Sequence, residues 1–215
     1  MLDNDALIRL SVLTALIVAF QVLVSHVSLE REAKRRWQHA LTGHVIVQAS
    51  YIIPMSYGNA GLMIGAVGMA YVRLYHPYKF MEAFGPLLRP EELEAGKLPG
   101  AFHFLIGSSL TATLFNLPIA RYAVECLAIA DPMAAFVGKS VPSPQLNKSA
   151  SVAGSFACFI TSLVVGYLML EDASLLQLSM GALGCTLAEA MPFGNDNLTI
   201  PLMTAVAVAC FSNSY

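Results

Sequence analysis

The sequence predicts an all-α protein built as a polytopic bundle of about seven or eight membrane-spanning helices. Of its 215 residues, 56% are hydrophobic and 12% are charged, whereas about a quarter of the residues are charged in an ordinary soluble domain. A small soluble domain exposes too much of its surface to water to hide so much apolar area. The composition therefore excludes an ordinary soluble globule, a disordered chain and a basic nucleic-acid-binding protein. It predicts a single integral-membrane domain over residues 1–215.

Apolar segments recur along the whole chain, and a helix needs about 20 such residues to cross a bilayer. Polar or proline-rich stretches separate the segments, the longest of them at 76–100. Several segments are short, so tilted or re-entrant helices are expected among them. The predicted helical segments are residues 6–27, 40–54, 59–75, 101–117, 122–137, 150–170, 175–190 and 198–211.

Small residues inside these segments predict close packing. Gly61, Gly65 and Gly68 would let two helix backbones approach each other. The four cysteines also fall inside apolar segments, and none forms a CxxC pair. This pattern argues against a zinc site, a redox dithiol or a disulfide framework, and it favours thiols buried between helices.

Positive charge is concentrated on alternate loops. If the apolar segments span the membrane, the loops at 28–38, 76–100, 138–149 and 192–197 share one side. They contain or border ten of the twelve lysines and arginines. Because basic loops stay on the cytoplasmic side, we expect these loops to face the cytoplasm, or the stroma or matrix of an organelle. The polar motifs lie in or beside the same loops, so a site at that membrane face is expected.

The first polar motif is a basic cluster. Arg35 and Arg36 precede His39 by four and three residues, so on a helix both neighbour it. Guanidinium groups beside an imidazole at the membrane surface suit the binding of a phosphate. The alternative is a basic cluster that only sets the topology, with Trp37 as an interfacial anchor.

The second motif is a carboxylate inside an apolar segment. Asp131 lies about seven residues, or ~10 Å of helix, before the polar end of that segment. A charge at that depth costs several kcal/mol unless it is paired, hydrated or bound to a cation, so Asp131 is a candidate functional residue. Pro132 frees backbone groups and favours a bend that opens space for a ligand. The structural alternative is a hydrogen bond between helices, the role also expected of Glu125.

The third motif combines lysines with hydroxyl groups. Lys139 lies between Gly138 and Ser140, and Lys148 is followed by Ser149. The Gly-Lys-Ser run is not a P-loop, because Met133 stands where that pattern requires glycine and no strand precedes it. Two lysines and several hydroxyls around a flexible loop can still bind a polyphosphate.

The fourth motif is Glu189 followed by the Gly-Asn-Asp-Asn run at 194–197. Asp196 and Asn197 supply hard oxygen ligands of the kind that Mg²⁺ takes beside nucleotide phosphates, although such a run is also a common turn. Together the four motifs provide acids, cations and a hydrophobic border. Phosphoryl transfer to a lipid alcohol requires these parts, because its catalysis depends on positioning and charge neutralisation.

Five segments, in this order, resemble the membrane family that contains phytol kinase, farnesol kinase, dolichol kinase and CTP-dependent diacylglycerol kinase. They are RRWQHALTG, LPGAFHFLIG, LAIADPMAAFVGK, NKSASVAGS and AEAMPFGNDNLTIPL, and they span residues 35–201. The resemblance implies a multi-helix membrane fold surrounded by lipid. It also implies Mg²⁺-dependent transfer of a phosphoryl group from a nucleoside triphosphate, with CTP as the expected donor, to an isoprenoid alcohol or to diacylglycerol.

The resemblance also implies roles for individual residues. The chain departs from the family pattern at two points. Ala130 stands where the family often has glycine, and the spacing from Lys-Ser to Gly-Ser is two residues longer than is usual in the family. We expect Asp131, Asp196 and His39 to be catalytic. We expect Asp131, Asp196 and Asn197 to hold Mg²⁺. We expect Arg35, Arg36, Lys139, Lys148 and Ser149 to bind the nucleotide phosphates.

Two other functions remain open at this point. A cytidylyltransferase that makes a CDP-activated lipid would use the same nucleotide and cation site but break a different bond. A small transporter or non-catalytic membrane module would use Asp131 for ion coupling. That function predicts repeats of inverted topology, and no repeat is evident in the sequence.

Overall fold

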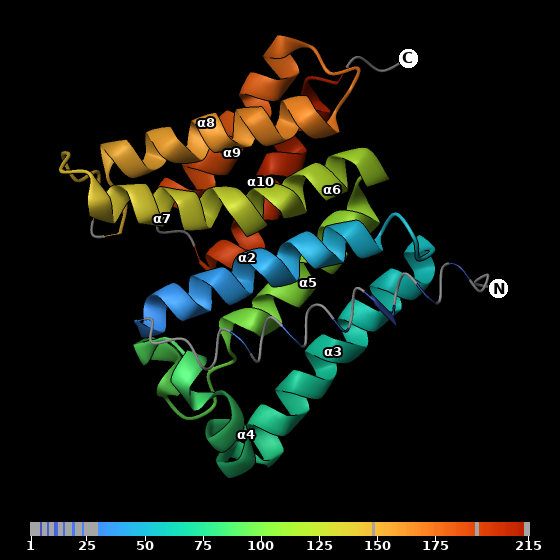
Figure 1. Ribbon diagram of the computed structural model, residues 1–215, viewed down its shortest axis with the longest axis vertical. Helices are drawn as coiled ribbons and strands as arrows, with labels where there is room; N and C mark the ends of the chain where they lie inside the picture. Colours follow the sequence, from blue (N-terminus) through green and yellow to red (C-terminus); the bar gives the residue numbers. More distant parts are fainter. Residues whose placement is uncertain are drawn as a thin grey trace. The chain divides into compact units, whose positions relative to one another are not determined.

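The computed structural model describes residues 30–147, 149–191 and 194–212, together with seven single positions before them: Asp5, Ile8, Ser11, Val12, Ala15, Ala19 and Leu23. The described chain is helical (Figure 1), and its β-structure is an isolated bridge between Gln145 and Ser151. The predicted all-α class is therefore confirmed. Most of the segment predicted at 6–27 lies outside the described residues.

The α-helices are α2 (Arg31–Ala49), α3 (Met55–Tyr75), α4 (Pro77–Phe84), α5 (Gly100–Leu114), α6 (Leu117–Glu125), α7 (Asp131–Ser140), α8 (Val152–Met169), α9 (Leu175–Ala190) and α10 (Asp196–Cys210). Two short 3₁₀ helices, η1 (Gly85–Leu87) and η2 (Pro90–Leu93), follow α4. A π-helical turn, η3 (Cys126–Ala130), joins α6 to α7.

Helix length limits what can cross a membrane. Among the described residues, α8 is the helix both long enough and apolar enough to do so. The apolar helices α5, α9 and α10 have 15 or 16 residues, or about 22–24 Å of helix against a hydrocarbon core of about 30 Å. The prediction of seven or eight spanning helices is therefore not supported. The physical reasons are the short length of α5, α9 and α10 and, for the 21-residue helix α3, too little hydrophobicity.

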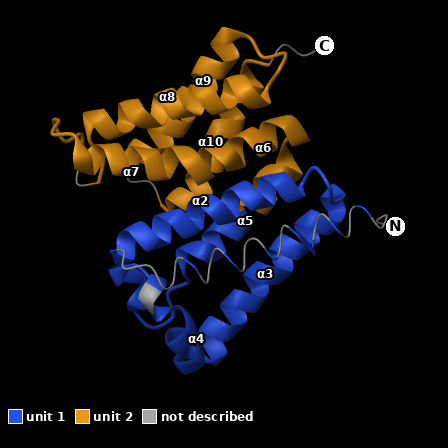
Figure 2. Ribbon diagram, viewed as in Figure 1, with its two compact units in different colours: residues 1–106 blue, residues 107–215 orange. Residues whose placement is uncertain are grey.

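The chain forms two compact units, Met1–Ile106 (unit 1) and Gly107–Tyr215 (unit 2), with the division inside α5 (Figure 2). In unit 1, the long stretch at 76–100 folds around a buried arginine rather than forming an open loop. Arg73 donates hydrogen bonds to the carbonyl oxygens of Lys97, Glu92 and Glu94 at 3.0, 2.9 and 2.8 Å. Its guanidinium also lies 5.4 Å from the ring centroid of Phe80, a favourable cation–π geometry.

In unit 2, α6, η3 and α7 follow one another directly, and α8, α9 and α10 pack beside them (Figure 1). Tyr122 is fully buried in this core. Three cysteines, Cys126, Cys158 and Cys185, are buried with it, and the Sγ atoms of Cys158 and Cys185 are 3.7 Å apart. The expectation of thiols buried between helices is confirmed for these three cysteines and wrong for Cys210, which is exposed.

Glycine packing differs from the sequence expectation. A Cβ atom added at Gly61 or Gly68 would meet no described atom within 4 Å, and one at Gly65 would make only a van der Waals contact with the Leu105 side chain at 3.4 Å. The close approach of two helix backbones predicted there is therefore wrong within the described part of the chain. Close contacts occur instead in unit 2. At Gly184, an added Cβ would lie 2.6 Å from Cβ of Ala207 and 2.9 Å from the carbonyl oxygen of Met203.

Gly184→Ala should therefore force α9 away from α10 and lower the free energy of unfolding by about 1–3 kcal/mol, the usual cost of overpacking. Gly68→Ala is the matched control. It adds the same methyl group to open space, and alanine is the better helix former by about 1 kcal/mol. Denaturant unfolding of both variants checks the expectation. A Gly184→Ala protein as stable as Gly68→Ala would contradict this close contact.

Candidate functional site

Unit 2 brings together three carboxylates that are far apart in the sequence, here named the carboxylate cluster: Asp131, Glu189 and Asp196. Asp131 is the first residue of α7, Glu189 lies in the last turn of α9, and Asp196 is the first residue of α10. Glu189 interacts electrostatically with both aspartates. The cluster forms because α8 packs against both α7 and α9, and α9 packs against α10.

Glu189 is the most perturbed member of the cluster. Burial, followed by the negative charges of Asp131 and Asp196, raises the pKa of Glu189 from 4.5 to about 7. The nearby Ser155 hydroxyl acts in the opposite direction. The Oε2 atom of Glu189 is buried and has no hydrogen-bond partner among the described residues. Repulsion between like charges and an unsatisfied oxygen both favour a cationic ligand at this position.

A π-helical turn positions Asp131. The proline at 132 has no N–H group, and its ring would collide with the carbonyl of residue 128 in a regular α-helix. The five residues of η3 immediately before Asp131 adopt the wider π form, which relieves this conflict and is frequent at functional sites. The bend expected at Pro132 is therefore expressed as a local widening of the helix just before Asp131.

Asn147 connects the loop at 141–151 to the end of α9. Its Oδ1 atom accepts hydrogen bonds from the backbone N–H groups of Ser149 and Ala150, at 2.8 and 2.9 Å. Its Nδ2 atom donates to the carbonyl oxygen of Ala190, the residue after Glu189. Asn147 therefore holds the loop beside the carboxylate cluster. From the sequence, the one available signal for this role is an Asx-type turn at Asn147-Lys148-Ser149.

Replacing Asn147 with alanine should lower the free energy of unfolding by about 2–3 kcal/mol, because several hydrogen bonds are lost and the Ala190 carbonyl loses its partner. Ser149→Ala is the matched control. It removes an exposed hydroxyl that lies 3.0 Å from the Asn147 Oδ1 atom, and it should change stability by less than about 0.5 kcal/mol. Thermal unfolding of both variants measures the difference. Equal stabilities would show that Asn147 does not hold the loop.

The predicted phosphate-binding residues of unit 2 lie at its exposed polar end. Lys139 is in the last turn of α7 and is exposed, as is Ser149. Lys148 lies outside the described residues. The first amides of α8 are already engaged: Ser143 Oγ accepts from Ala153 N at 3.1 Å, and Ser151 Oγ accepts from Gly154 N at 3.2 Å. Side chains, and not this helix terminus, are therefore the groups that could bind a phosphate here.

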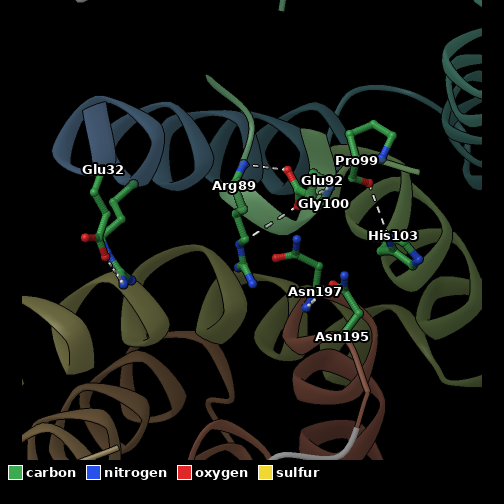
Figure 3. Close-up of polar contacts among 9 residues, drawn as sticks. Glu32, Arg89, Glu92, Pro99, Gly100, His103, Asn195 and Asn197 are labelled. Carbon is green, nitrogen blue, oxygen red and sulfur yellow. Dashed lines mark hydrogen bonds and ion pairs between the residues drawn. The ribbon is translucent and has the colours of Figure 1, made fainter. Parts of the chain in front are cut away.

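Asn197 is buried in the first turn of α10. Its backbone N–H donates to Oδ1 of Asn195, the N-cap residue, at 3.1 Å (Figure 3). Its carbonyl oxygen faces Gly107 so closely that a Cβ on Gly107 would collide with it. These contacts fix the turn that carries Asp196.

The other predicted residues belong to unit 1 and lie on α2. Glu32 accepts hydrogen bonds from Arg36 Nε at 3.2 Å and Nη2 at 2.8 Å, so Arg36 is held in an ion pair. The ring of His39 packs edge-on against Phe104, with 4.8 Å between the centroids. Burial, followed by the positive charges of Arg89 and Arg36, lowers the pKa of Arg35. The structure thus groups Asp131 with Asp196 in one unit, and Arg35, Arg36 and His39 in the other.

The donor atoms of the carboxylate cluster suit Mg²⁺ in kind. Among the described residues, no three His, Cys, Asp or Glu side chains converge closely enough to ligate one metal ion by themselves. Magnesium rarely requires such a cage, because it usually keeps several waters and is bound by one or two carboxylates plus substrate phosphates. Asp131, Asp196 and the unsatisfied Glu189 Oε2 atom therefore fit a cation that arrives with a phosphate ligand.

Comparisons with known proteins add one relative. No family model matches the chain, and no solved structure matches it. Over 123 residues the chain is 32% identical to RP860, an uncharacterized protein of Rickettsia prowazekii (strain Madrid E). The match covers 53% of this chain and 59% of RP860, so the chain spans less than two thirds of that relative, whose name states no activity.

Proposed function

We propose that the protein is a membrane-embedded lipid-alcohol kinase. It transfers a phosphoryl group from a nucleoside triphosphate, with CTP as the preferred donor, to an isoprenoid alcohol such as phytol, farnesol or a polyprenol, or to diacylglycerol. The observation that carries the proposal is the carboxylate cluster. Asp131 and the Glu189–Asp196 motif are far apart in the sequence, and in unit 2 the charges of both aspartates act on Glu189.

The chemistry of phosphoryl transfer explains why such a cluster is needed. The triphosphate is strongly negative, and catalysis of its transfer consists mainly of positioning and charge neutralisation. Bound at the cluster, Mg²⁺ would supply the positive charge that neutralises the phosphates as the bond breaks. Asn147 would keep the loop at 141–151 beside the cluster, and the exposed Lys139 would supply an ammonium group for the phosphates.

The surface of α8 supports a lipid environment. Phe156, Ile160, Val164 and Tyr167 are spaced along one face of this helix, and they are 65%, 42%, 53% and 75% exposed. A continuous exposed apolar face is unusual for a soluble monomer and typical of a surface that contacts membrane or protein. We therefore propose an integral-membrane location with the carboxylate cluster at the cytoplasmic or stromal face.

This location has a direct test. The protein should stay with the membrane fraction after alkaline carbonate extraction and should be released only by detergent, because α8 would have its exposed face in hydrocarbon. Release into the supernatant by carbonate alone, in a folded state, would contradict the membrane location.

The activity is tested with purified protein in detergent. The assay supplies Mg²⁺ with CTP, UTP or ATP, and a panel of phytol, farnesol, a polyprenol and diacylglycerol. We expect a phosphorylated lipid and a nucleoside diphosphate from at least one pair of nucleotide and lipid. A CDP-lipid with pyrophosphate would assign the protein to cytidylyltransferases instead. The absence of a lipid product from every pair, with folded protein, would contradict both activities.

A further inference from the structure

Two buried thiols of unit 2 contact each other from neighbouring helices. Cys158 lies on α8 and Cys185 lies on α9, and both side chains are fully buried. Their Sγ atoms are 3.7 Å apart, although the residues are 27 positions apart in the chain. The packing of α8 against α9 creates this contact, so no CxxC spacing predicts it. The fold therefore provides a dithiol that the sequence pattern does not show.

The thiol pair belongs to a close antiparallel contact between the two helices. A Cβ atom added at Gly166 of α8 would lie 3.0 Å from Cδ2 of Leu178 on α9. Cys158 lies about two turns before Gly166, and Cys185 lies about two turns after Leu178. The backbone thus holds both sulfur atoms at the same level of the helix pair. They need to approach by roughly 1.6 Å to reach the length of an S–S bond, so small movements of the side chains and of α9 are sufficient.

A hydroxyl group lies beside the thiols. Ser162 is fully buried one turn after Cys158 on α8, and its side chain is close enough to interact with the thiols of Cys126 and Cys185. A hydroxyl can donate a hydrogen bond to a sulfur atom that carries negative charge, and this stabilises the thiolate that reacts with an oxidant. Hydrogen peroxide is uncharged and little larger than water, so it is the class of oxidant that suits such a buried position.

The thiol pair also lies one helical turn from the carboxylate cluster. Glu189 follows Cys185 by four residues on α9, so the two side chains share one face of the helix, about 6 Å apart along its axis. The charges of Asp131 and Asp196 act on Glu189, and its position relative to them depends on where α9 lies. A shift of Cys185 toward α8 would therefore move Glu189 through a single turn of helix.

We propose that Cys158 and Cys185 form a redox switch, in which hydrogen peroxide oxidises them to a disulfide that draws α9 toward α8 and displaces Glu189. In the first step, one thiolate sulfur attacks a peroxide oxygen, the O–O bond breaks, and the hydroxide that leaves takes up a proton to become water. The other sulfur then attacks the sulfenic acid so formed, the S–S bond forms, and a second water leaves. Two thiols are thereby oxidised, and one peroxide is reduced to two waters. As a control of lipid phosphorylation, the switch rests on the proposed function.

The first test counts thiols and requires no activity. Full-length Cys210→Ser protein, which lacks the exposed thiol, is reduced in detergent, freed of reductant and treated with hydrogen peroxide. The remaining thiols are alkylated after denaturation and counted by mass spectrometry. We expect the loss of two thiols, a peptide that links Cys158 to Cys185, and reversal by dithiothreitol.

Matched variants in the same background assign the bond. Cys126→Ser removes the third buried thiol and should still form the disulfide. Cys158→Ser and Cys185→Ser, which nearly preserve side-chain shape, should each fail to form it. Buried thiols that stay free in the folded protein would overturn the proposal, as would a disulfide that contains Cys126.

The second test measures the consequence for the site. Oxidation should lower the kcat of lipid phosphorylation by about 10- to 100-fold, because a displacement of about 1 Å in an active site has an effect of this size. Dithiothreitol should restore the rate, and Cys158→Ser should keep its rate in peroxide. A disulfide that leaves the kcat of an active enzyme unchanged would overturn the switch. Failure of the proposed function has a different signature, since the disulfide would form while the reduced protein makes no lipid product with any nucleotide.

Discussion

Replacing Asp131 with asparagine should lower the kcat of lipid phosphorylation by about 100- to 1,000-fold while the protein stays folded. A loss of this size is expected when a charged group that stabilises the transition state is removed. Asparagine has nearly the same shape, and the charge of Asp131 is repelled by Glu189, so the substitution should not destabilise unit 2. Asp196→Asn should act in the same direction.

Asp172→Asn is the control for this effect. Asp172 is an exposed residue of unit 2 in the turn between α8 and α9, and its neutralisation should leave kcat unchanged. Initial rates at saturating nucleotide, over a range of Mg²⁺ concentrations, give the comparison. Turnover by Asp131→Asn near the wild-type value would make Asp131 a scaffold residue that hydrogen-bonds helices, a role that asparagine can fill.

Glu189→Gln should have opposite effects on activity and stability. The pKa of Glu189 is about 7 in the folded chain against 4.5 ordinarily, so the folded state binds this proton more tightly. The wild-type protein should therefore lose stability as the pH rises from about 5 to about 7, by about 1–3 kcal/mol in the absence of Mg²⁺. Glutamine carries no charge, so the variant should lack this loss and be the more stable protein at neutral pH.

Activity should fall in the same variant, by about 10- to 100-fold, because one oxygen ligand loses its charge. Such an exchange of activity for stability is typical of functional residues. Unfolding in EDTA at several pH values measures the change in stability, and initial rates in Mg²⁺ measure the change in activity. A Glu189→Gln protein with wild-type activity would exclude Glu189 from the site, and one with an unchanged pH dependence of stability would contradict the repulsion within the cluster.

Sequence alone can identify an acidic residue when its immediate neighbours in the chain already make its position unusual. Asp131 stands out because it lies inside an apolar segment before a proline, and Asp196 because it lies in an amide-rich turn. The importance of Glu189 depends on its distance from both, which is set by the packing of α9 against α10. The sequence places Glu189 in one motif with Asp196 but gives no sign that it also lies near Asp131, so no role in the site follows for it from the sequence alone.

The remaining features depend on contacts between distant segments. Asn147 acts through the carbonyl of Ala190, which is 43 residues away. The stretch at 76–100 folds around Arg73, whereas its composition resembles a loop. The extents of the helices followed from hydropathy, whereas their ability to span a membrane did not, since hydropathy does not register the π turn before Asp131 that divides the apolar segment into α6 and α7.

Transfer of the terminal phosphoryl group is the central claim, and the position of a radioactive label tests it most directly. The purified protein is incubated with Mg²⁺, the acceptor lipids and CTP labelled at either the γ or the α phosphate, with ATP and UTP in parallel. We expect the lipid to acquire the γ label and none of the α label, with CDP as the second product and loss of labelling in Asp131→Asn. Appearance of the α label in the lipid, or of neither label with folded protein, would contradict the assignment of this chain as a lipid-alcohol kinase.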